Sequence, residues 1–122
     1  MELFNILPKI REVDAAVHPA DQQWLRESHP EVTFRLLGGA AESKKTAAGQ
    51  AQRLTRLASR LPPFEPAAVR ARLGPARVQI DDVLDAAACL VAARRMLDGV
   101  AVTLPHDTVE LDARGLRMEI VS

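Results

Sequence analysis

Aromatic residues are scarce in this chain of 122 residues, which has one tryptophan, three phenylalanines and no tyrosine. A surface that stacks single-stranded bases needs several aromatic rings, so the composition argues against one. The single cysteine, Cys89, excludes an intrachain disulfide and a cysteine-rich zinc site. Because no run approaches the ~18–20 apolar residues of a membrane span, we expect no membrane partner.

The chain has the composition of an ordinary globular domain, with 48% hydrophobic and 26% charged residues. Its first residues lack the basic start and apolar run of a signal peptide, so we expect a cytoplasmic protein of one domain. The net charge is zero, but residues 35–77 carry +7 between flanks of −3 and −4. This pattern argues against bulk attraction to nucleic acid and leaves a local basic patch open.

Apolar spacing predicts mostly helices. Ile6, Ile10, Val13 and Val17 mark one helix face over about 5–17. The S-x-x-E pattern of Ser28–Glu31 predicts a capping box that starts a short helix ending at Gly38-Gly39. Further helices are expected at about 46–60, 66–73 and 81–98, and short strands at 24–27, 100–104 and 116–121. The fold class is therefore α/β or α+β, with few strands.

Acidic residues gather at the start of the last expected helix. Asp82 and Asp85 are three positions apart and thus neighbours on one face, while Asp81 precedes them. They favour either an N-cap with first-turn acids, or a metal or acid–base site. Glu27 and Glu31 flank His29 and offer further oxygen ligands that Mg²⁺ prefers, although Glu31 also fits the capping box and Glu27 a solvated strand edge.

Basic residues open the central region. Lys44 and Lys45 lie beside an expected helix start, a combination that suits a phosphate and also occurs on ordinary surface loops. Arg53, Arg56 and Arg60 recur at helical spacing, which we interpret as a solvated face. Cys89 falls on an apolar helix face and is expected in the core.

Taken in order, these motifs resemble the bacterial family of domain of unknown function 429, nearly end to end. The segments that carry the resemblance are Phe4–Asp14, Arg26–Val32 with Phe34, Ser43–Thr46 with Gly49 and Arg53, Asp81–Ala86, and Gly115–Ile120. The resemblance implies an RNase H-like nuclease, which needs a divalent metal. Glu27 matches the acid of a strand, and Asp82 and Asp85 match the D-x-x-D of the last helix. These three would be the catalytic residues and the ligands of Mg²⁺ or Mn²⁺. Lys44 and Lys45 match the basic motif.

The chain departs from that family at its start. An RNase H-like domain opens with a three-stranded meander whose first strand carries an essential Asp. Residues 1–122 correspond only to the half of the domain after this meander. We therefore expect a partial RNase H-like fold, mostly helical with a small mixed sheet, whose open edges favour a homo-oligomer, most simply a dimer. The function expected is a metal-dependent nuclease acting on nucleic acid and incomplete on its own. The alternative is a non-enzymatic interaction or phosphate-binding module.

Overall fold

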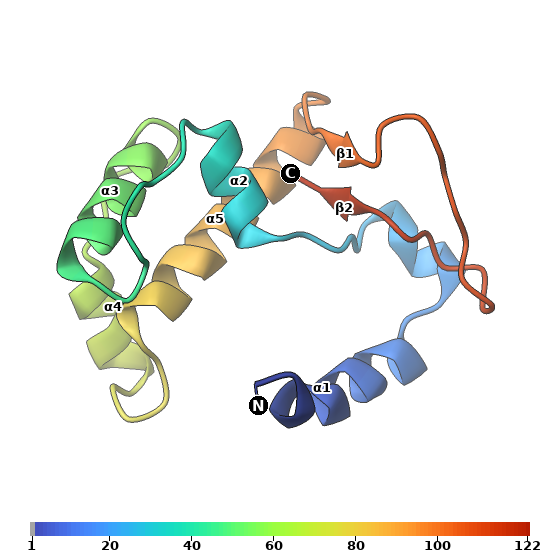
Figure 1. Ribbon diagram of the computed structural model, residues 1–122, viewed down its shortest axis with the longest axis horizontal. Coiled ribbons are helices and arrows are strands. Elements are labelled where there is room, and N and C mark those ends of the chain that lie inside the picture. The colour runs from blue at the N-terminus through green and yellow to red at the C-terminus, as the bar shows by residue number, and fades with distance from the viewer. Residues whose placement is uncertain (1) are drawn as a thin grey trace.

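A computed structural model describes residues 2–122, with side chains from Asn5 onward. Met1, part of the argument against a signal peptide, lies outside the described residues. The elements in chain order are α1 (Glu2–Ala16), η1 (Pro19–Gln23), α2 (Pro30–Leu36), α3 (Ala47–Ala58), α4 (Pro66–Leu73), α5 (Ile80–Leu97), β1 (Thr103–Leu104) and β2 (Ile120–Val121). The described chain is therefore mostly helical with one small sheet (Figure 1).

Helix α5 is the centre of the fold, because α2, α3 and α4 all pack against it (Figure 1). The apolar side chains at these contacts form one core cluster, which consists of Phe34, Leu57, Leu84, Ala88 and Val91. Local sequence signals mark the ends of α3 and α4. Pro66 opens α4 and Gly74 ends it, and Thr46 caps α3 by accepting a hydrogen bond from the Gly49 amide at 3.0 Å.

The sheet differs from the expected mixed one. Its two strands are antiparallel, with Thr103 opposite Val121 and Leu104 opposite Ile120. They are joined by a long hairpin whose arms meet again at the bridge between Leu111 and Arg117. Asp112 builds the turn of this hairpin, since its Oδ1 accepts from the amides of Arg114 and Leu116. A returning hairpin pairs its arms antiparallel, which is why no parallel strand arises.

The strand expected at residues 24–27 does not form. The 3-10 helix η1 occupies the approach to it, and residues 25–29 are extended without belonging to a ladder. One backbone bond ties this segment to the sheet, from the Val121 amide to the Glu27 carbonyl at 2.9 Å. Trp24 is instead the turn residue that ends η1, and the chain after it passes beside β2 without joining the sheet (Figure 1).

The capping box expected at Ser28–Glu31 is also wrong. His29 is the N-cap of α2, and Pro30 takes the first helical position. Glu31 turns to Arg53 of α3, with its Oε2 3.0 Å from Nη2. A charge-assisted bidentate contact across the fold is stronger than a neutral capping bond, so the long-range partner wins.

Helix α1 begins three residues before the expected range of 5–17 and stands apart from the core (Figure 1). Its expected apolar face is largely uncovered, since Ile6, Ile10 and Val13 are 51%, 48% and 60% exposed. No helix within residues 2–122 combines the length and apolar character needed to cross a membrane.

Candidate functional site

Two motifs that lie far apart in the sequence meet at the start of α5. Lys44 Nζ lies 2.8 Å from Asp85 Oδ2, and Lys45 Nζ lies 2.6 Å from Asp81 Oδ2. Asp81 and Asp85 are one helical turn apart and so present their carboxylates to the same loop. We call these four residues the Lys–Asp cluster. The lysines expected to bind phosphate and one of the acids expected to bind metal therefore do belong to one site.

The loop before α3 is held close to that helix by small-residue packing. A Cβ on Gly49 would overlap the Ser43 carbonyl oxygen, so only glycine permits this approach. The Thr46 hydroxyl donates to the same Ser43 carbonyl at 2.8 Å, and Gln50 Nε2 donates to the Lys44 carbonyl at 3.0 Å. These contacts fix the backbone from which both lysines reach α5.

Ion pairing shifts the pKa values of Lys44 and Asp81 in the cluster. The hydrogen bond to Asp85 raises the pKa of Lys44 above 10.5 despite partial burial, with further help from the charges of Asp81 and Glu31. Burial alone would raise the pKa of Asp81, but the hydrogen bond and charge of Lys45 outweigh it and leave the pKa below 3.8. Lys44 and the Asp81 carboxylate are thus both charged at neutral pH.

The lowered pKa of Asp81 predicts an acid-sensitive contribution to stability. A carboxyl group whose folded pKa is below its unfolded value stabilises the fold fully above the unfolded value and loses this as pH falls through the folded one. We expect Asp81→Asn to cost a constant amount of unfolding free energy above about pH 5. The difference from the wild type should shrink as pH falls below 3.8. Urea unfolding at several pH values measures this, and a difference that grows in acid would contradict it.

Behind the cluster lies a buried arginine. Arg53 is only 5% exposed, which corrects the expectation that it belongs to a solvated stripe. Its guanidinium pairs with Glu31, donates to the carbonyls of Glu42 and Gly49 at 2.8 and 3.2 Å, and lies 5.5 Å from the centroid of the Phe34 ring. Arg53 therefore joins α2, α3 and the loop that carries the lysines.

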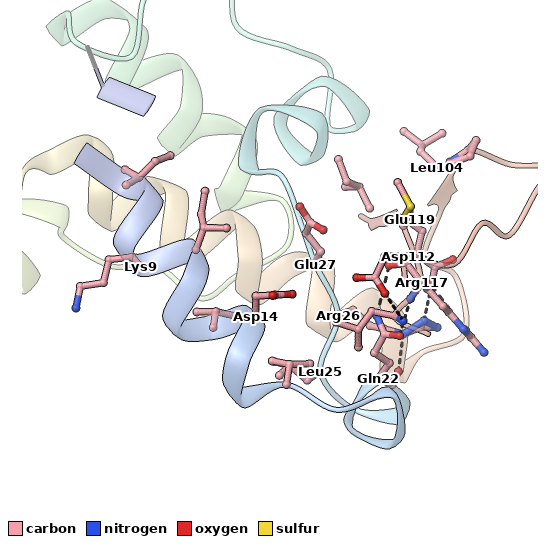
Figure 2. Close-up of a pocket in the computed structure, with 18 residues that line it drawn as sticks. Lys9, Asp14, Gln22, Leu25, Arg26, Glu27, Leu104, Asp112, Arg117 and Glu119 are labelled. Atoms are coloured by element: carbon pink, nitrogen blue, oxygen red, sulfur yellow. Dashed lines mark hydrogen bonds and ion pairs between the residues drawn. The ribbon is translucent and has the colours of Figure 1, made fainter. Parts of the chain in front are cut away.

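Two of the expected metal ligands lie outside the Lys–Asp cluster. Asp82 is exposed and accepts a hydrogen bond from the Gln79 amide at 2.8 Å, which makes it a capping residue of α5. Glu27 lines a groove beside α1, whose lining includes neither Asp82 nor Asp85 (Figure 2). In the part of the chain that the structure describes, no group of three or more His, Cys, Asp or Glu side chains is arranged to hold a metal ion. A metal role for Glu27, Asp82 and Asp85 stays a prediction.

Asp81 is the cluster acid that was not among the expected metal ligands. The sequence suggested it as the N-cap of the last helix, but Gln79 is the N-cap, and the side chain of Asp81 is buried. The useful signal is the i, i+4 spacing of Asp81 and Asp85, which matches the adjacent lysines of the loop. Cys89, one turn beyond Asp85, is half-buried, and burial raises the pKa of its thiol.

Comparison with known proteins identifies the family. No curated protein and no solved structure matches the chain. A family model does match, over residues 2–110, and it is described as a protein of unknown function, DUF429. That range contains every residue of the Lys–Asp cluster together with Glu31 and Arg53. The match spans most of the sequence, and the chain therefore belongs to the DUF429 family.

Proposed function

We propose that this chain binds the phosphodiester backbone of a nucleic acid at the Lys–Asp cluster, as the phosphate-binding part of an RNase H-like domain. The observation that carries the proposal is the pairing of both motif lysines with carboxylates one turn apart on α5. The carboxylates hold the ammonium groups in position for a phosphate. They also balance the charge of these ammonium groups when no phosphate is bound.

The exposure of the cluster supports binding of a large ligand. The side chain of Lys45 is 68% exposed while its partner Asp81 is 5% exposed, so the lysine leans from a buried carboxylate into solvent. A phosphate oxygen can approach this ammonium without displacing core residues. Arg56, in the last turn of α3, is exposed and donates to the Gly39 carbonyl at 2.9 Å, which adds positive charge beside the start of the loop.

Binding can be measured by the fluorescence anisotropy of a labelled double-stranded oligonucleotide in low salt. We expect Lys44→Gln and Lys45→Gln each to weaken binding several-fold, because each removes one phosphate contact. Arg60→Gln removes the same charge from an exposed position in the turn just after α3 and is the matched control. Equal losses in all three variants would indicate bulk attraction and contradict a site at the cluster.

Asp85→Asn gives a test of opposite sign. Removing the carboxylate frees the ammonium of Lys44 from its ion pair, so we expect metal-free binding to strengthen. If Asp85 only orders the loop, the variant should weaken binding instead. Urea unfolding of the same variant separates a change in affinity from a change in folding.

A metal-dependent nuclease is the second candidate, and one atom favours it. Asp85 Oδ1 is buried and has no hydrogen-bond partner within the described residues, which leaves an acceptor for a ligand. The two carboxylates of the cluster are too few for the expected centre, and the described residues do not otherwise fit Mg²⁺ or Mn²⁺. We therefore derive no catalytic step through a metal.

Cleavage of mixed nucleic acids with Mg²⁺ or Mn²⁺ tests this candidate. If this chain forms a metal site through the D-x-x-D motif, Asp82→Asn and Asp85→Asn should both abolish cleavage. We expect no cleavage by the wild type, because its described carboxylates do not converge. Metal-dependent cleavage that both variants lose would establish the nuclease as the activity that the phosphate-binding cluster serves.

A further inference from the structure

A groove separates α1 from the rest of the molecule, on the side away from the Lys–Asp cluster. It encloses about 840 Å³ and is lined on one side by the apolar face of α1. The opposite side is formed by the segment after η1 and by the two arms of the C-terminal hairpin (Figure 2). The apolar side chains there are Leu25, Leu104, Leu116, Met118 and Ile120.

The groove is bordered by backbone of the segment after η1 that no strand of the sheet pairs along its outer side. Glu27 directs its carbonyl to β2, where the Val121 amide donates to it. In extended chain, the backbone groups of neighbouring residues point to opposite edges. Arg26 and Ser28 therefore present theirs away from β2, and within residues 2–122 neither makes a backbone–backbone hydrogen bond. An edge of this kind pairs with added extended chain.

The charged side chains around the groove indicate which charge a bound peptide should have. Arg26 and Arg117 both contact Glu119, and Asp14 pairs with Arg114. Glu27 is exposed and enters no ion pair among the described residues, and Figure 2 shows its carboxylate reaching into the space beside α1. A basic side chain on the occupant would complement it.

From these features we propose that the groove binds an extended peptide segment of another protein, which adds a strand at Arg26–Ser28. Its alternate residues are apolar and pack on α1, and a Lys or Arg reaches Glu27. This inference does not depend on the phosphate-binding proposal, because no residue of the Lys–Asp cluster lines the groove.

A second copy of this chain fits the edge less well. In two of the three antiparallel two-fold registers centred within Arg26–Ser28, Arg26 or Glu27 faces the same residue of the other copy, and only the register centred on Ser28 avoids this. Like charges directly opposite each other destabilise a strand pair. This argues against the simplest dimer expected from the sequence, in which the open edges pair with themselves.

Selection of peptides from a displayed random library on the full chain tests the proposal. We expect enriched peptides to alternate apolar residues and to carry a Lys or Arg. In amide hydrogen exchange, the best of them should slow exchange at Arg26 and Ser28 about tenfold or more, as strand addition requires. Enrichment of apolar residues at helical spacing, protection elsewhere only, or no enrichment would overturn it.

Substitutions locate the peptide. Val13→Asp puts a carboxylate on the apolar wall and should weaken peptide binding about tenfold, whereas Arg11→Asp on the same helix should not. Glu27→Gln should cost about threefold and Glu12→Gln nothing. Light scattering tests whether a second copy of the chain occupies the groove instead of a peptide. A wild-type dimer that Val13→Asp dissociates would assign the groove to a second copy and overturn the proposal.

Discussion

Arg53→Met is expected to lower the free energy of unfolding by about 3 kcal/mol, because it leaves a buried network without its donor. The guanidinium makes a bidentate contact with Glu31. It also donates to one carbonyl of the loop, that of Glu42, and to one carbonyl of α3, that of Gly49. Methionine fills much of the same volume, so the loss measures the polar contacts rather than a cavity.

Urea unfolding gives the size of this effect. Arg60→Met removes an exposed arginine from the turn just after the same helix and should stay within about 0.5 kcal/mol of the wild type. Arg53→Lys keeps the charge but not the fork geometry, and we expect an intermediate loss. An Arg53→Met protein as stable as the wild type would show that the network does not hold the loop.

Gly49→Ala should destabilise the protein by about 2–3 kcal/mol, although alanine ordinarily stabilises a helix by about 1 kcal/mol over glycine. The added methyl group would collide with the Ser43 carbonyl, and backbone on both sides leaves little room to yield. The loop must move away from α3, which also shifts Lys44 and Lys45 relative to α5.

The sign of the change decides this prediction. Ala48→Gly, at an exposed neighbouring position in α3, should cost only the ordinary helix propensity of about 1 kcal/mol. We expect Gly49→Ala to weaken oligonucleotide binding as well, while Ala48→Gly should leave binding unchanged. A Gly49→Ala protein more stable than the wild type would contradict the close approach of the loop.

Local signals in the sequence were enough for most of the helices. The range 66–73 lies between Pro66 and Gly74 and matches α4 to the residue. The apolar face of α1 was also readable, but periodicity does not say whether a face is covered, and this one is exposed. The sequence could not show whether the segment near Glu27 forms a strand, since strand formation depends on a hydrogen-bonding partner from the opposite end of the chain.

The candidate site was found only in pieces for a similar reason. Lys44, Lys45 and Asp85 all stood out from the sequence, but their contact depends on how α3 and α5 pack. Arg53 carries no local mark of burial. Arg53 is buried in a pair with Glu31, which lies 22 positions earlier. The S-x-x-E pattern had indicated that Glu31 belongs to a capping box.

The salt dependence of oligonucleotide binding tests the central claim most directly, namely that the Lys–Asp cluster contacts phosphate. Each lysine that contacts a phosphate of duplex DNA adds about 0.9 to the slope of log affinity against log salt. We expect the slope of the Lys44→Gln/Lys45→Gln double variant to be smaller than that of the wild type by about two such contacts. An unchanged slope, with the variant still folded, would contradict a phosphate-binding role for the cluster.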